Sequence, residues 1–155
     1  MTDPYQTPEA DVNVPSQEVV YVGFWLRVAA SIIDSIIIMA ITLPILLAIY
    51  GKEYLLGTTF IHGFADVLIN YIFPAIAVIL FWIYKSATPG TMAIGAEIVD
   101  ARTFGKPSKG QLIGRYLGYY VSILPLMLGI IWVAFDARKQ GWHDKLAGTV
   151  VIQRR

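Results

Sequence analysis

The feature that most constrains this chain is an apolar run from Phe24 to Tyr50, in which only Arg27 and Asp34 carry a charge. About 20 apolar residues are enough for a helix to cross a bilayer, and this run is longer. A second run, from Val67 to Tyr84, contains Asn70 but no charged residue. The two runs predict two transmembrane helices joined by a short loop.

The composition excludes several other classes of protein. Hydrophobic residues make up 56% of the chain and charged residues 15%, compared with about 45–50% and about 25% in soluble domains. The net charge of +1 and the absence of cysteine argue against a nucleic-acid partner, a disulfide framework and thiolate chemistry. His62 and His143 form no zinc motif, and no nucleophile is paired with a base. We therefore expect a non-enzymatic protein without metal or cofactor, whose partner is the lipid bilayer.

A third apolar stretch, from Leu112 to Phe135, is interrupted at Leu124-Pro125, and strand-like segments at 96–101 and 149–152 flank it. Cytoplasmic loops carry the excess of Lys and Arg. If the stretch crosses the membrane, six of the twelve basic residues lie on each side of the membrane. If it forms a short helical hairpin, eleven lie on one side and one on the other. We expect the hairpin, with both termini and a small β-pair on the cytoplasmic side of an all-α membrane protein. A single tilted crossing is the alternative.

The first 21 residues are polar and acidic, include prolines and lack Lys and Arg. A secretory signal has a basic start and an apolar stretch, and this segment has neither. We expect a disordered acidic tail over residues 1–21, followed by one membrane domain over residues 22–153.

Asp34 is the residue most indicative of a site, because it lies about 15 Å into the first helix. A charged side chain at mid-bilayer costs about 2.5–3.5 kcal/mol on insertion scales, and such residues are often functional. Arg27 lies on the same helix face, about 10.5 Å away along the axis. The pair predicts an ion, proton or ligand site, with Asn70 as a secondary candidate. The alternative is a structural role, with Arg27 reaching the headgroups.

Three ordered motifs resemble the RDD family of bacterial membrane proteins. They are Gly23-Phe24-Trp25-Leu26-Arg27 with Asp34, Thr88-Pro89-Gly90 followed by Ile94 to Asp100, and the closing segment from Phe135 to Val151. The resemblance covers about residues 22–153. The chain departs from the family at Thr91, because family members usually have a basic residue at this position. The resemblance therefore gives little support for a contact with a lipid phosphate at Thr91.

The family takes its name from one arginine and two aspartates. Arg27 and Asp34 match the first two, and Asp144 matches the third better than Asp136 does. The resemblance implies a multi-pass protein of the bacterial inner membrane that transports an unidentified ligand, with cation–proton exchange as the most specific form. So short a chain would need a homo-oligomer to enclose a path. The alternative is a scaffold or accessory subunit in which the triad is a structural latch.

The hairpin topology brings the closing segment back to the start of the first helix. We therefore expect Asp144 to pair with Arg27 and to leave Asp34 unpaired. His143 is a candidate proton relay, or else a packing residue.

Overall fold

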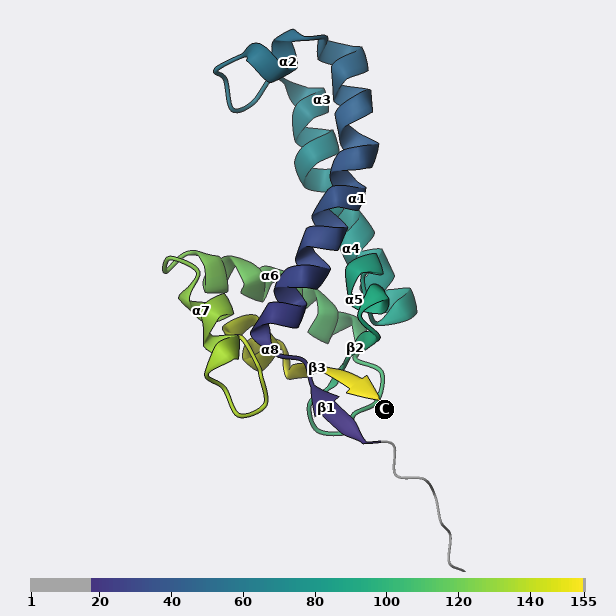
Figure 1. The fold of residues 1–155 in the computed structure, drawn as a ribbon, viewed down its shortest axis with the longest axis vertical. Coiled ribbons are helices and arrows are strands. Elements are labelled where there is room, and N and C mark those ends of the chain that lie inside the picture. Colours follow the sequence, from purple (N-terminus) through teal and green to yellow (C-terminus); the bar gives the residue numbers. More distant parts are fainter. Residues whose placement is uncertain (1–17, 155) are drawn as a thin grey trace, which may run out of the picture.

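Two long apolar helices stand on a wider lower body in the computed structural model, which describes residues 18–154 (Figure 1). The first is α1 (Phe24–Tyr50). The second spans Phe64–Lys85 and consists of α3 (Phe64–Val67), the π-helix η1 (Leu68–Ile72) and α4 (Phe73–Lys85). Both are long and apolar enough to cross a membrane, as predicted. The short helix α2 (Glu53–Leu56) lies in the loop between them.

Both long helices end at a residue with a positive φ. Gly51 follows α1 with a φ of 70° and donates its N–H to the Leu47 carbonyl at 2.8 Å. Ser86 follows α4 with a φ of 53° and donates to the Trp82 carbonyl at 3.0 Å. These bonds satisfy carbonyls that the last helical turn leaves free, so each helix stops within a residue or two of its apolar run.

A three-stranded antiparallel sheet lies below the helical pair. Its strands are β1 (Val19–Tyr21), β2 (Ala96–Asp100) and β3 (Thr149–Arg154), in the order β1-β3-β2. Ile98 pairs with Val151, and both are almost fully buried, so the predicted β-pair is correct. Since β2 and β3 are hydrogen-bonded, the segments on either side of the third apolar stretch meet at the same end of the helical pair.

The third strand corrects the predicted tail. Val19–Tyr21 was expected to be disordered, but it forms β1 and pairs with the end of β3 from Arg154 to Ile152. Two valines and a tyrosine have high strand propensity, and β3 would otherwise present an open edge. Val22, the next residue, has no exposed surface and belongs to the core with Ile98 and Val151. The rest of the predicted tail, residues 1–17, lies outside the described residues.

The third apolar stretch is bent sharply. It contains α6 (Lys109–Ile123), α7 (Leu128–Ile131) and the 3-10 helix η2 (Trp132–Ala134), with an angle of 111° at the break. Ser108 and Gln111 form the capping box that the sequence predicted, with bonds of 2.9 and 3.2 Å. In Figure 1, α6 runs across the lower body and not beside α1.

The close approach of α7 to α6 at this bend requires glycine at position 129. A Cβ at this position would lie 2.6 Å from Cα of Ser122, so only glycine allows α7 to approach α6 so closely. Two further short helices, α5 (Pro89–Ala93) and α8 (Trp142–Ala147), complete the lower body. α8 packs on α6, and α5 packs on α1.

Candidate functional site

Asp144 is the centre of a buried ion-pair cluster between α1, α6 and α8. Its carboxylate has no exposed surface. Oδ2 accepts hydrogen bonds from Nη1 of Arg27 at 2.6 Å and from the backbone N–H of Gly141 at 2.9 Å. Oδ1 pairs with Nη1 of Arg115. The sequence predicted the pair of Arg27 and Asp144, and the structure brings these two side chains into direct contact.

Arg27 does not reach towards the headgroups, as the alternative interpretation supposed. Its side chain is only 13% exposed, and all three of its nitrogen groups are used. Besides Asp144, Nε donates to the Val22 carbonyl at 3.2 Å and Nη2 donates to the Lys139 carbonyl at 2.5 Å. Arg27 therefore ties the start of α1 to the end of β1 and to the loop before α8.

Arg115 is a member of the cluster that the sequence analysis missed, because it was counted only as a basic residue beside a loop. Its side chain is 3% exposed and lies 5.3 Å from the ring centroid of Trp82 and 5.6 Å from that of Tyr119. Nη1 also donates to Thr149 Oγ1 at 3.0 Å. Helical spacing could have revealed it, because Leu112, Arg115 and Ser122 occupy one buried face of α6.

His143 packs inside the same cluster. Its ring stacks on Tyr119 with 3.9 Å between centroids, and its Nδ1 lies 3.3 Å from Ser122 Oγ. Burial, reinforced by the positive charges of Arg115 and Arg27, lowers the pKa of His143 far below its usual range. The imidazole is therefore neutral at physiological pH, which favours the packing role over the proton relay.

Asp34 has no ion-pair partner among the described residues, as the sequence predicted, but its carboxylate is hydrogen-bonded, which the sequence did not indicate. Its Oδ2 accepts a hydrogen bond from Thr88 Oγ1 at 2.5 Å, and its Oδ1 accepts one from the Gly90 N–H at 2.7 Å. Both donors belong to the start of α5, a segment that the sequence showed only as a linker motif. The carboxylate thus receives two neutral donors, and no cationic side chain pairs with it among residues 18–154.

Glycine at position 90 allows this contact. A Cβ there would overlap the backbone carbonyl of Ala30 and lie 2.9 Å from Cγ of Asp34. α5 can therefore approach α1 closely only because residue 90 has no side chain.

The two remaining candidates lie elsewhere. Asn70 donates to Asp66 Oδ1 at 2.5 Å and to the Tyr54 hydroxyl at 2.8 Å, in a polar cluster at the opposite end of the helical pair. Asp136 accepts backbone N–H bonds at 3.1 Å and pairs with Lys145 at 2.7 Å, so it shapes the loop before α8. Of the two aspartates considered for the third position of the family triad, Asp144 is the one that contacts Arg27.

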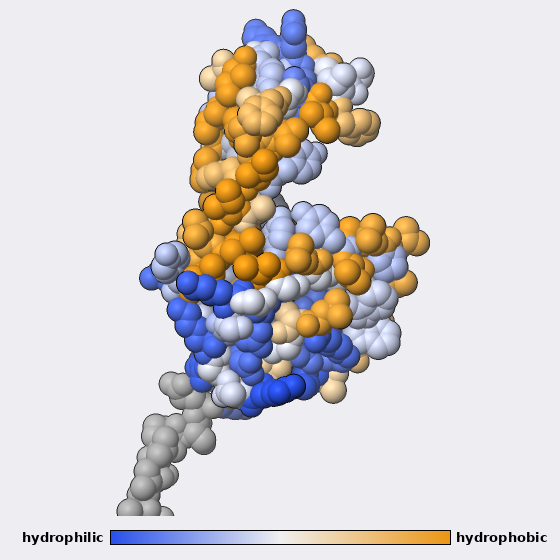
Figure 2. All heavy atoms as spheres, turned by 180° about the vertical axis from the view of Figure 1, so that it is seen from behind, coloured by the Kyte–Doolittle hydropathy of each residue, from blue (hydrophilic) through white to orange (hydrophobic). Residues whose placement is uncertain are grey.

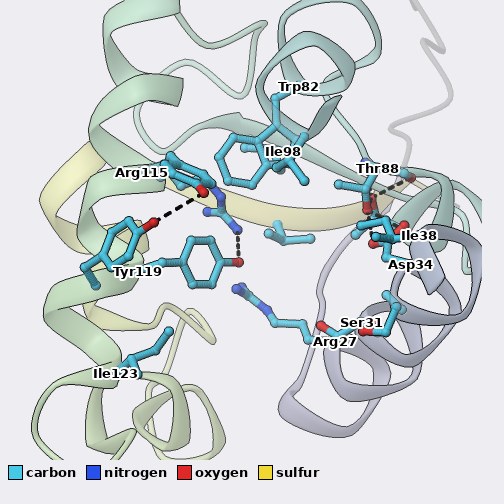
Figure 3. Close-up of a pocket in the computed structure, with 17 residues that line it drawn as sticks. Arg27, Ser31, Asp34, Ile38, Trp82, Thr88, Ile98, Arg115, Tyr119 and Ile123 are labelled. Carbon is cyan, nitrogen blue, oxygen red and sulfur yellow. Dashed lines mark hydrogen bonds between the residues drawn. The ribbon is translucent and has the colours of Figure 1, made fainter. Parts of the chain in front are cut away.

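A cavity of about 400 Å³ separates the ion-pair cluster from Asp34. Figure 3 shows the guanidinium groups of Arg27 and Arg115 pointing towards the tip of Tyr119 on one side, with Asp34 and Thr88 on the other. Its walls come from α1, α4, α5, α6 and the sheet, and its apolar lining includes Ala30, Ile38, Val78, Trp82, Ile98, Ile123 and Val151. The cavity can hold a small charged or amphipathic ligand.

The arrangement offers charge and hydrogen bonds but no metal site. Within the described part of the chain, no three His, Asp or Glu side chains are grouped so that they could hold a metal ion. The charged groups that line the cavity are the guanidinium groups of Arg27 and Arg115 and the carboxylate of Asp34.

The model of the RDD family matches residues 21–148. The chain belongs to the RDD family. It is 28% identical over 149 residues to the uncharacterized protein YxaI of Bacillus subtilis (strain 168), with 85% of this chain and 97% of YxaI covered. It is 26% identical over 137 residues to the uncharacterized membrane protein YteJ of the same strain, with 87% and 82% covered.

A third relative matches over a shorter segment. The uncharacterized protein RP437 of Rickettsia prowazekii (strain Madrid E) is 43% identical over 75 residues, which are 48% of this chain and 41% of RP437. No solved structure matches the chain. This RDD protein is a membrane protein, and the three relatives named above are each described as uncharacterized.

Proposed function

We propose that this RDD protein moves a small ligand across the membrane by way of the cavity, with cation–proton exchange at Asp34 as its specific form. The observation that carries the proposal is the position of Asp34, a carboxylate on the cavity wall that is held by two neutral donors. Intramembrane acids of this kind commonly mark ion or proton pathways. Asp34 is also about 15 Å along α1 from its start, well inside the apolar run.

The bonds to α5 suggest how exchange would be coupled to movement. The ionised carboxylate accepts from Thr88 and from Gly90 and so holds α5 against α1. Protonation removes the charge that strengthens both bonds and loosens α5. A cation entering from the cavity competes with the same two donors for the carboxylate oxygens. Because one helical pair encloses little space, a homo-oligomer completes the path in this proposal.

The cluster around Asp144 supports a second candidate function, that of a scaffold or accessory subunit. Arg27, Arg115 and Asp144 join α1, α6 and α8 through contacts that are almost entirely buried. A latch of this kind positions the helices for a partner without moving any ligand. The guanidinium groups of Arg27 and Arg115 lie across the cavity from Asp34 and Thr88 in Figure 3, so the two candidates make separable predictions.

For the orientation, we infer that both termini lie in the cytoplasm and that the protein resides in the bacterial inner membrane. The pairing of β2 with β3 supports this, because it gathers the basic residues of the second loop and of the closing segment at one end of the helical pair. Such an excess favours the cytoplasmic side. A reporter that works only in the cytoplasm should be active when it is fused to the carboxyl end. A fusion that is active only outside the cytoplasm would show the opposite orientation.

Flux measurements in proteoliposomes test the exchange. We expect sodium or potassium gradients to drive proton movement with the intact protein, and Asp34→Asn to abolish it while the variant still inserts and folds. Glu53→Gln is the matched control, because it makes the same acid-to-amide change at an exposed residue of α2. Unchanged flux in Asp34→Asn would remove Asp34 from the pathway. No flux with the intact protein would favour the scaffold.

A further inference from the structure

The guanidinium group of Arg115 has unused binding capacity. Its Nε is buried and has no hydrogen-bond partner among the described residues, although Arg115 lines the cavity. Nη2 makes only a long bond of 3.4 Å to the Tyr119 hydroxyl. A buried charged donor without a good partner costs about 1–3 kcal/mol or more. A ligand that accepts from Nη2, which points towards the Tyr119 hydroxyl in the lining of the cavity, would therefore be favoured.

The charges around the cavity favour an anion at this end. Arg27 and Arg115 share a single buried carboxylate, that of Asp144, and the cluster therefore carries one surplus positive charge. All three nitrogen groups of Arg27 already have protein partners. Arg115 is therefore the group that remains to bind a ligand, and planar guanidinium groups bind phosphate and carboxylate well.

This end of the molecule also has the features of a membrane–water interface. Trp25 is 78% exposed at the start of α1, and Tyr84 is 74% exposed at the end of α4. Exposed Trp and Tyr gather at the headgroup level of a bilayer. In Figure 2, hydrophobic residues cover the upper helical pair and hydrophilic ones gather on the lower body. The cavity extends from this level, at Arg27, into the apolar run of α1 as far as Ile38, so a headgroup would lie at its Arg27 end.

The face of α1 that lines the cavity continues as an apolar surface. Ile38 belongs to the cavity, and Ile41, Thr42 and Ile45 follow it on the same face at helical spacing. These three residues line a second cavity of about 410 Å³, whose other wall consists of Leu68, Ile69, Ile72, Phe73 and Ile76. An acyl chain that follows α1 would lie in it.

We propose that the cavity binds an anionic membrane lipid, with its phosphate on the Arg115 guanidinium and an acyl chain along the apolar face of α1. This site lies across the cavity from Asp34 and needs no ion flux, so it goes beyond the transport proposal. The guanidinium recognises the phosphate, and the apolar face recognises the chain. A soluble phosphate compound would satisfy only the first of these contacts.

Native mass spectrometry of the full chain released from nanodiscs tests this site. The probes are phosphatidylglycerol, phosphatidylcholine, glycerol 3-phosphate and inorganic phosphate. We expect one phosphatidylglycerol per chain, bound at least about tenfold more tightly than phosphatidylcholine. Both lipids carry the phosphate, but the choline cation of phosphatidylcholine is repelled by the surplus positive charge of the cluster, and a repulsion of about 1.4 kcal/mol gives a factor of that size. Equal binding of the two lipids, or binding of the soluble phosphates alone, would overturn the proposal.

Two variants locate the lipid. Ser31→Trp fills the cavity from α1 and should lower phosphatidylglycerol binding about tenfold. Ile32→Trp is its control, because Ile32 is 54% exposed and does not line the cavity. Arg115→Lys keeps a positive charge for Asp144 but lacks the second terminal donor, Nη2, so it should reduce binding while the fold persists. Equal binding in Ser31→Trp and Ile32→Trp would place the lipid elsewhere.

The lipid site and the exchange reaction can fail separately. Asp34→Asn should keep its bound phosphatidylglycerol even where flux is lost. Lipid binding without flux in the intact protein overturns only the transport proposal. Flux with no preference for phosphatidylglycerol overturns only the lipid site.

Discussion

Removing the charge of Asp144 should strongly destabilise the fold. In Asp144→Asn, the side chain keeps its shape, but Arg27 and Arg115 lose the carboxylate that they share. Asp144 is 0% exposed and the Arg115 side chain is 3% exposed, so water cannot replace the lost charge. Breaking a buried ion pair by removing one partner typically costs about 3–5 kcal/mol. We expect the free energy of unfolding to fall by about that amount. A typical domain is stable by only about 5–15 kcal/mol.

The assay is equilibrium unfolding in mixed detergent micelles, followed by the fluorescence of the four tryptophans. Glu97→Gln is the matched control, since it breaks the ion pair of Glu97 with Arg154. The two side chains of that pair are 37% and 38% exposed, and exposed pairs contribute about 0–1 kcal/mol. The free energy of unfolding should therefore fall several times further in Asp144→Asn than in Glu97→Gln.

Equal losses in the two variants would refute the reasoning, because they would mean that the Asp144 cluster is as well hydrated as a surface pair. A double-mutant cycle of Arg27→Ala and Asp144→Ala gives a second check. Contacting groups show coupling energies of about 0.5–3 kcal/mol, whereas distant residues are additive. Additive losses would show that the Arg27–Asp144 contact contributes nothing to stability.

Three further substitutions test the packing around the cavity. Gly90→Ala should destabilise the fold by about 1–3 kcal/mol in the same unfolding assay, since its Cβ meets the Ala30 carbonyl. Unchanged stability would mean that α5 does not pack on α1. Gly129→Ala should also weaken it, because its Cβ would lie 2.6 Å from Ser122 Cα, and proteolysis at the bend should speed up. Burial lowers the pKa of His143 in the folded protein, so the imidazole binds a proton more readily when the chain is unfolded. Stability should be full above pH about 6.5 and should fall by about 1.4 kcal/mol per pH unit below it, a slope absent from His143→Gln.

The features that the sequence predicts well are local. The apolar runs 24–50 and 67–84 predict helices because length and hydropathy alone decide whether a segment suits a bilayer. The capping box at Ser108 depends on residues three positions apart. The pairing of Ile98 with Val151 followed from one further assumption, that both strands lie on the same side of the membrane. Each of these predictions needed little or no tertiary information.

The features that were missed depend on contacts between distant segments. Arg115 meets Asp144 from a different helix, and Thr88 meets Asp34 across 54 positions of the chain. No pattern near Asp34 shows that its carboxylate is hydrogen-bonded to α5. Likewise, Val19–Tyr21 is too short to signal a strand by itself, and it becomes one because the edge of β3 is available.

The central claim is that one face of α1 lines a cavity that water and ligands can reach, while the neighbouring face lies against lipid. The chain has no cysteine, so single cysteines at positions 31 and 32 can be compared directly in liposomes of phosphatidylcholine. Ser31→Cys should react with a water-soluble maleimide. Ile32 is exposed outside the cavity, so we expect lipid to cover Ile32→Cys and to slow its reaction at least about tenfold, because the thiolate requires water. Equal rates at the two positions, or a faster reaction at position 32, would contradict the claim.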